Sequence, residues 1–221
     1  MSTIDFLLFY FDAFLLICGV VLLIPCTVLL LESVAALIPF SEEKIRDEEQ
    51  FKNTKIAVLV PAHNEDLIID STLKDLNCKI PNDHELIVVA DNCTDSTADI
   101  ARQLGATVIE RQDETNRGKG YALDYGLQYM EQQPPDVVIF IDADCFVQQG
   151  TLEKLTQLAV TTKRPVQATY LMSKPAQATP KDAVSALAFK VKNQVRLLGL
   201  KRFGLGCTLV GTGMAFPWSA I

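Results

Sequence analysis

The sequence predicts an α/β protein whose doubly wound, mostly parallel sheet is preceded by one N-terminal transmembrane helix. Two observations support this fold class. Residues 13–31 form an apolar run without a charged residue. From residue 55 onward, short apolar runs alternate with segments of helical spacing. Continuous apolar runs of four to eight residues are typical of strands that are buried on both faces of a parallel sheet.

The apolar run is long enough to cross a bilayer, since 19 residues at 1.5 Å each give about 28 Å. We expect an anchor with its flanks over 6–40 and a polar linker over 41–54. Basic residues are absent before the run and frequent in the linker, which predicts a cytoplasmic location for the rest of the chain. A cleaved signal peptide is the alternative, but its basic N-terminal region is missing.

The remaining elements alternate regularly along the chain. We expect Thr94 to cap the second helix of the domain and Ser219 to begin another helix near the end. The predicted strands are 56–62, 85–91, 107–110, 136–144 and 165–171, and the predicted helices are 67–76, 94–104, 120–130, 150–160 and 181–203.

The composition excludes several classes of protein. With 49% hydrophobic residues the chain is not disordered, and a net charge of −7 argues against a basic surface that binds nucleic acid. Six scattered cysteines and two histidines do not form a zinc module. Basic residues gather in 181–203, which favours either a helix at the membrane surface or an ordinary solvated helix.

Polar residues follow three of the predicted strands: His63-Asn64-Glu65, Asp91-Asn92 and Asp142-Ala143-Asp144. Ligands bind at the carboxyl ends of the strands in such sheets, so these residues predict one site. Asp142 and Asp144 suggest Mg²⁺ or Mn²⁺ holding a diphosphate, with loop-capping aspartates as the alternative. Arg117-Gly118-Lys119-Gly120 before a helix suggests an anion-binding loop, with an ordinary turn as the alternative.

Taken together, these motifs resemble family 2 glycosyltransferases of the GT-A fold. The resemblance covers about residues 55–217. It is carried in order by Val58–Glu65, Val89–Thr97, Arg117–Leu123, Phe140–Asp144 and Gly211–Phe216.

The resemblance implies a role for each motif. The first strand end and Asp91 would hold the base and ribose of a UDP-sugar, and the glycine-rich loop would line the diphosphate. Asp142 and Asp144 would bind the ribose and the metal, and Gly211, Thr212 and Gly213 would border the acceptor. The implied donor-binding residues are Pro61, Ala62, His63, Asn64, Glu65, Asp91, Asn92, Gly118, Lys119, Asp142 and Ala143.

One departure concerns catalysis. The family's general base lies downstream of the Gly-x-Gly stretch, and we expect it beyond Ile221. We therefore expect a fragment in which the GT-A domain, 55–221, is incomplete.

The predicted function is that of a membrane-anchored inverting glycosyltransferase. It would move a sugar from a UDP-sugar to a saccharide or lipid-linked acceptor in polysaccharide or glycan synthesis. Two alternatives stay open. One is a membrane-tethered protein that binds nucleotide sugars without turnover. The other is a HAD-type phosphohydrolase, because Val138–Asp144 resembles the nucleophile strand of that class.

Overall fold

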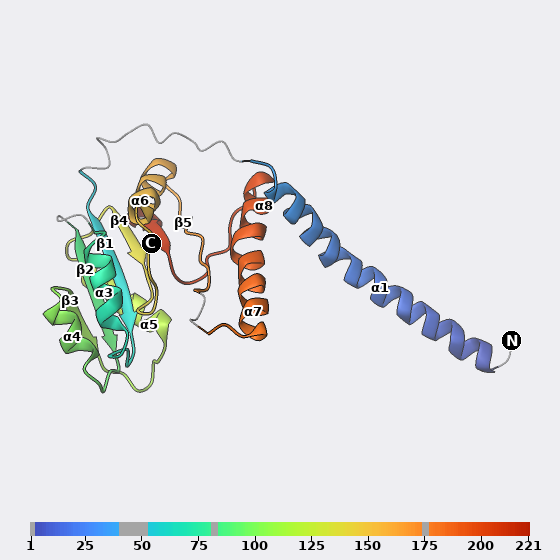
Figure 1. The fold of residues 1–221 in the computed structure, drawn as a ribbon, viewed down its shortest axis with the longest axis horizontal. Helices are drawn as coiled ribbons and strands as arrows, with labels where there is room; N and C mark the ends of the chain where they lie inside the picture. Colours follow the sequence, from blue (N-terminus) through green and yellow to red (C-terminus); the bar gives the residue numbers. More distant parts are fainter. Residues whose placement is uncertain (1–2, 40–52, 81–83, 174–176) are drawn as a thin grey trace. The chain divides into compact units, whose positions relative to one another are not determined.

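The computed structural model describes residues 3–39, 53–80, 84–173 and 177–221 (Figure 1). The chain forms two compact units: residues 1–42 with 171–208, and residues 43–170 with 209–221. The predicted boundaries, with an anchor over 6–40 and a catalytic domain over 55–221, stay a prediction. The predicted linker, 41–54, lies largely outside the described residues.

The second unit contains a six-stranded sheet in the order β3-β2-β1-β4-β6-β5. The four strands from β3 to β4 are parallel, whereas β6 is antiparallel to both of its neighbours. The predicted mostly parallel α/β sheet is therefore confirmed. The strands are β1 (Ile56–Ala62), β2 (Glu85–Asp91), β3 (Thr107–Arg111), β4 (Val137–Phe140), β5 (Val166–Gln167) and β6 (Met214–Pro217).

Helices cover both faces of this sheet. Val58 and Val60 pack into a core with α3 (Ile69–Asn77), α4 (Thr97–Gln103) and α6 (Thr151–Thr162). Leu59 points to the opposite face and packs against α5 (Lys119–Met130). Successive side chains of a strand alternate between faces, so β1 must be apolar throughout, as its sequence is.

The predicted fourth strand, 136–144, is too long. The structure ends β4 at Phe140, because its partner β6 begins there with Met214 opposite Phe140. Residues 141–144 therefore leave the sheet edge as a loop. The predicted strand 165–171 is reduced to Val166–Gln167, and β6 was not predicted as a strand at all.

Two predicted helix starts are also wrong. Helix α4 begins at Thr97 rather than after Thr94, because the Asp95 carboxylate accepts hydrogen bonds from the Thr97 amide (3.1 Å) and hydroxyl (2.6 Å). The last helical turn, η2 (Trp218–Ala220), already includes Ser219, and Pro217 precedes it.

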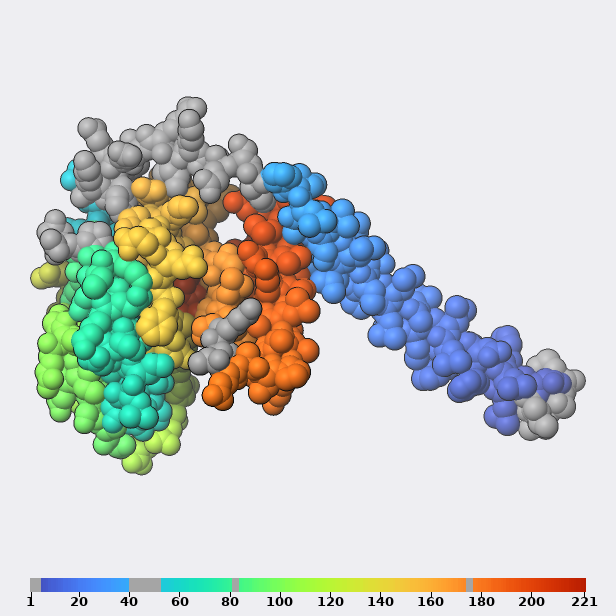
Figure 2. Space-filling model, in the orientation of Figure 1, coloured from blue at the N-terminus to red at the C-terminus, as the bar shows by residue number. Residues whose placement is uncertain are grey.

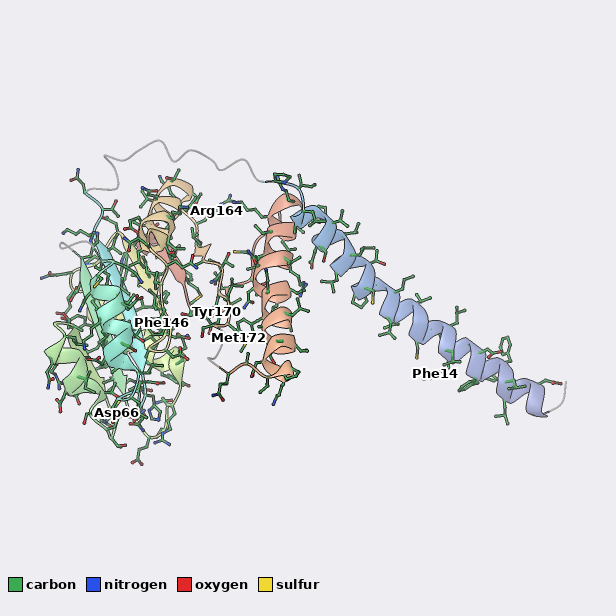
Figure 3. The ribbon with its side chains drawn as sticks, viewed as in Figure 1. Phe14, Asp66, Phe146, Arg164, Tyr170 and Met172 are labelled. Carbon is green, nitrogen blue, oxygen red and sulfur yellow. The ribbon has the colours of Figure 1, made fainter. Side chains whose placement is uncertain are left out.

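The first unit contains one long apolar helix, α1 (Thr3–Ala36). Its segment Asp5–Ala36 is long and apolar enough to cross a membrane. The apolar side chains are exposed along its length, as Phe14 illustrates (Figure 3). The hydroxyls of Thr27 and Ser33 donate to backbone carbonyls one turn earlier, so they present no unsatisfied donor to an apolar environment.

The C-terminal end of α1 packs against a second helical segment of the same unit (Figure 2). This segment consists of α7 (Pro180–Lys190), a π-helical turn η1 (Val191–Val195) and α8 (Arg196–Arg202). Glu32 is buried on α1 and forms an ion pair with Arg196 (Nε to Oε2, 2.6 Å). Gly199 lies against the backbone of Glu32, where an added Cβ would stand 2.3 Å from its carbonyl oxygen. Only glycine permits this approach.

Candidate functional site

The carboxyl ends of β1, β2 and β4 surround a cavity of about 450 Å³. The loop before α5 completes it. The predicted donor-binding residues except Asn64 line this cavity, together with Arg117, Ala122 and Asp144. Residues that are distant in sequence therefore meet at the sheet edge where the strand pattern placed them.

The loop after β1 is fixed to the loop after β2. Asn64 has φ +55°, a left-handed conformation that asparagine tolerates better than most residues. Its side-chain oxygen accepts a hydrogen bond from the Thr94 amide (2.8 Å), so Asn64 positions the loop rather than facing the cavity. His63 Nδ1 lies 2.7 Å from the carbonyl oxygen of Asp91. These contacts hold the first two strand ends in one arrangement.

Asp91 is buried at the end of β2 and carries a negative charge that needs a partner. Arg111, at the end of β3, donates to its carboxylate (2.7 Å), and the Asn92 amide group also donates to it (3.1 Å). Arg111 forms a second ion pair with Asp113 (3.0 Å). Sequence reasoning missed Arg111 and Asp113. The signal was available, because Arg111 ends the strand that follows β2 in the chain.

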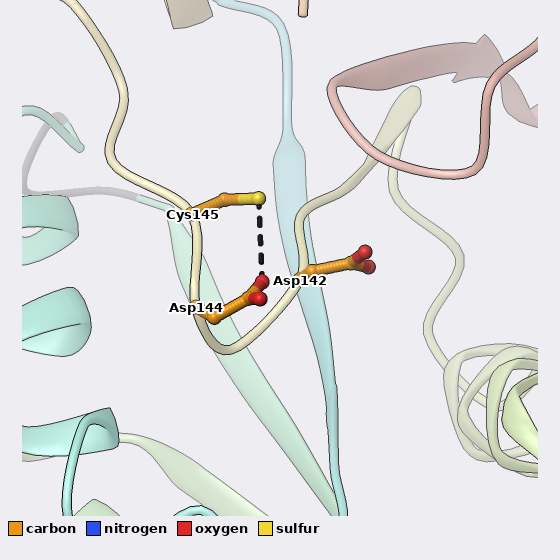
Figure 4. Close-up of side chains that lie close together, drawn as sticks. All are labelled: Asp142, Asp144 and Cys145. Carbon is orange, nitrogen blue, oxygen red and sulfur yellow. Dashed lines mark hydrogen bonds between the residues drawn. The ribbon is translucent and has the colours of Figure 1, made fainter. Parts of the chain in front are cut away.

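Asp142 and Asp144 lie just beyond β4. One ligand atom from each carboxylate and the sulfur of Cys145 lie within 4.8 Å of one another (Figure 4). The Cys145 thiol lies 3.5 Å from Asp144 Oδ1, and burial raises the pKa of this thiol. A neutral thiol is a poor ligand for a hard cation, whereas two carboxylates suit Mg²⁺ or Mn²⁺. The residues present therefore fit a divalent cation that completes its coordination with other oxygen ligands.

Positive and negative groups both line the cavity. Lys119 forms an ion pair with Asp142, and Gly118 before it has φ +118°, a conformation that favours glycine. The pKa of Glu65 is raised, first by burial and then by the charges of Asp144 and Asp95. A cation bound beside Asp144 would oppose this shift.

The three predicted acceptor-side residues form a turn beside the cavity. The Thr212 hydroxyl accepts a hydrogen bond from the Asp142 amide (3.0 Å), and the Gly211 carbonyl oxygen accepts one from Lys119 Nζ (2.6 Å). Gly211 and Gly213 both have positive φ, +95° and +63°. The turn is thus attached to Asp142 in two ways, directly through the Thr212 side chain and through Lys119 from the Gly211 backbone.

Several supporting residues gave no recognisable signal in the sequence. Gln167 on β5 donates to the Thr212 carbonyl (2.8 Å) and accepts from the Val210 amide (2.9 Å). The Asp75 carboxylate on α3 accepts from the Val147 amide (3.1 Å), three residues after Asp144. Burial, with the nearby Cys145 and Asp144, raises the pKa of Tyr170 to about 12. Each of these depends on a contact between distant parts of the chain.

Comparison with known proteins identifies the family. The model of glycosyl transferase family 2 matches residues 57–200. The probable glycosyltransferase YdaM of Bacillus subtilis is 38% identical over 98 aligned positions, in a match that covers 41% of this chain and 23% of that protein.

Two solved structures have the same fold. Glucosyl-3-phosphoglycerate synthase from Mycobacterium tuberculosis, in complex with Mn²⁺, UDP-glucose and phosphoglyceric acid, matches with a TM-score of 0.53 and 25% identity. The match covers 82% of this chain and 63% of that one. A mannosyltransferase from Pyrobaculum calidifontis, in complex with GDP-mannose and Mn²⁺, matches with a TM-score of 0.53 and 21% identity, over 74% of this chain and 44% of that one.

The matches cover less than two thirds of each of these three proteins. They agree with the mostly parallel sheet, and they show the GT-A fold. The family match argues against a HAD-type phosphohydrolase, in which Asp142, just beyond β4, would be the nucleophile. The chain belongs to glycosyl transferase family 2.

Proposed function

We propose that this chain binds a UDP-sugar with a divalent metal, as the donor-binding part of an inverting glycosyltransferase. The observation that carries the proposal is the meeting of Asp91, Lys119, Asp142 and Asp144 around one cavity. A nucleoside diphosphate sugar needs a hydrogen-bonding group for the base, positive charge for the diphosphate and carboxylates for the metal. This cavity offers all three.

Each part of the cavity has an assigned role in the proposal. Asp142 and Asp144 hold Mg²⁺ or Mn²⁺, which when bound stabilises the diphosphate as a leaving group. Arg117 and Lys119 contribute positive charge, and Gly118 allows the backbone to approach a phosphate. Asp91 faces the base. The structure of glucosyl-3-phosphoglycerate synthase with Mn²⁺ and UDP-glucose supports the choice of metal and nucleotide.

The membrane arrangement is part of the same proposal. In this proposal helix α1 spans the bilayer and the sheet lies on the cytoplasmic side, an orientation that the basic residues after the apolar run support. The acceptor is a saccharide or a lipid-linked sugar that reaches the Gly211–Gly213 side of the site. Because such an acceptor grows by sugar transfer, the proposed role of the protein is in the synthesis of a polysaccharide or glycan.

The direct test is nucleotide binding to the 221-residue chain in detergent micelles, measured by isothermal titration calorimetry with and without Mn²⁺. Asp144→Asn removes one of the two ligand carboxylates while preserving the shape of the side chain. We expect wild-type protein to bind UDP only with Mn²⁺, and the variant to lose at least about 90% of its affinity, because truncating a close charge contact costs more than 1.4 kcal/mol.

The matched control is Asp99→Asn, an exposed residue of α4 whose replacement changes the net charge equally. It should bind UDP as wild type does. Metal-dependent binding that survives in Asp144→Asn would refute the site assignment. GDP in place of UDP tests the choice of base, and incubation with UDP-glucose separates an enzyme, which releases UDP, from a tethered binding protein, which does not.

A further inference from the structure

The ammonium group of Lys119 joins two parts of the candidate site. It forms an ion pair with the Asp142 carboxylate, and it donates a hydrogen bond to the carbonyl oxygen of Gly211 (2.6 Å). Lys119 begins α5, whereas Asp142 follows β4 and Gly211 precedes β6. One cation therefore connects three elements that are far apart in sequence.

Lys119 forms its ion pair with the Asp142 carboxylate, which a bound metal would need as a ligand. Ligand atoms of Asp142 and Asp144 lie within 4.8 Å of each other, so their negative charges repel unless a cation is near. Lys119 supplies that cation. The side chains of Lys119 and Asp142 are 38% and 32% exposed, and an ion pair this accessible to water contributes little stability. A divalent ion can therefore displace it.

The turn that contains Gly211 stays attached when Lys119 leaves. Gln167 holds the backbone on both sides of it, at Val210 and Thr212, and the Thr212 hydroxyl holds the Asp142 amide. Only the Gly211 carbonyl loses its partner. Displacing Lys119 thus loosens one side of the turn without detaching it from the sheet.

We propose that Lys119 is the resident counter-ion of Asp142, that a divalent metal must displace it, and that this displacement loosens the turn at 210–213. The inference rests on the proposed function, because it needs Asp142 as a metal ligand. Lys119 acts here as a positioning residue, through Asp142 and Gly211. Metal loading on the donor side is then linked to the mobility of the predicted acceptor side.

The first measurement is the affinity for Mn²⁺ alone, without nucleotide, by electron paramagnetic resonance of the full chain in detergent micelles. Lys119→Met removes the competing charge, so we expect about tenfold tighter Mn²⁺ binding, a modest effect for a unit charge near a divalent ion. Lys154→Met, at an exposed position on α6, changes the net charge equally and should bind Mn²⁺ with wild-type affinity.

The second measurement is hydrogen exchange of residues 209–213 by mass spectrometry. Adding Mn²⁺ should speed exchange in wild type and in Lys154→Met. In Lys119→Met exchange should already be fast and should not respond to Mn²⁺. Lys119→Gln separates charge from hydrogen bonding: it should bind Mn²⁺ as tightly as the methionine variant but retain part of the protection, because its amide can still donate to Gly211.

The outcomes separate this inference from the proposed function. Wild-type protein that binds Mn²⁺ neither alone nor together with UDP would overturn both, whereas binding of Mn²⁺ only together with UDP would overturn the inference alone. Wild-type binding that neither Lys119 variant tightens would overturn the inference alone, as would exchange at 209–213 that ignores Mn²⁺ in wild type. If the methionine variant fails to fold, the glutamine variant carries the same test of affinity.

Discussion

The packing of α5 on the sheet leads to a quantitative prediction at Gly126. A Cβ at this position would stand 2.7 Å from both δ-methyl carbons of Leu59 and 3.1 Å from Val89 Cγ2. Leu59 is 0% exposed, so its methyl groups have no free space to enter. Overpacking of this kind costs about 2 kcal/mol, and the better helix propensity of alanine returns about 1 kcal/mol. Gly126→Ala should therefore destabilise the protein by about 1 kcal/mol.

Leu59→Ala should cost about 3 kcal/mol, since it removes buried methyl groups and leaves a cavity. It also removes both short contacts to the new Cβ. In that background Gly126→Ala should become stabilising by about 1 kcal/mol, because the remaining 3.1 Å contact with Val89 Cγ2 can relax into the space that Leu59 leaves and the propensity gain then dominates. The double variant should thus lose about 2 kcal/mol, whereas simple addition of the two single effects gives about 4 kcal/mol.

The assay is denaturant unfolding of the full chain in detergent micelles, followed by the fluorescence of Trp218. This residue is the only tryptophan of the chain, and it packs against the core cluster that contains Leu59 and Val89. Its signal therefore reports on the layer that is changed. If the two substitutions add to within about 0.5 kcal/mol, Gly126 and Leu59 do not compete for space and the packing argument fails.

Two further predictions concern buried groups near the site. Burial raises the pKa of the Cys145 thiol, so iodoacetamide at pH 8 should label Cys145 much more slowly than the exposed Cys78. Peptide mass spectrometry measures both labelling rates, and equal rates would contradict this prediction. Arg111→Met should lower the midpoint of thermal unfolding, because it leaves the buried carboxylate of Asp91 without its partner. Asp91→Asn in the same chain should recover most of that loss in thermal unfolding, and no recovery would mean that Arg111 stabilises by packing alone.

The strands that a continuous apolar run marks in the sequence were predicted well. Residues 56–62 and 85–91 are strands from end to end, because each contains a continuous apolar run, 56–62 and 86–90, that is buried on both faces. The cavity lining followed from the same pattern, since parallel strands bring their carboxyl ends to one edge. For these parts of the fold, consecutive residues are enough to predict where a strand lies and where it ends.

The failures share one physical cause. Phe140 ends β4 because Met214 is where β6 begins, and nothing near Phe140 in sequence shows that partner. The same holds for Gln167 and Arg111, whose roles depend on turns and strands elsewhere in the chain. Local pattern predicts an element, but its ends and supporting contacts are fixed by neighbours that only the folded chain brings together.

The position of β6 has a consequence for how the protein forms. Strands β3, β2, β1 and β4 all lie within residues 56–140 and can pair as soon as that stretch is available. β6 must then return from Met214–Pro217 to cover the open edge of β4, and β5 pairs with β6. During synthesis that apolar edge stays uncovered while some seventy further residues emerge, a delay in which it can pair wrongly with other chains. Assembly of the last two strands is therefore the step at which we expect chaperones to matter most.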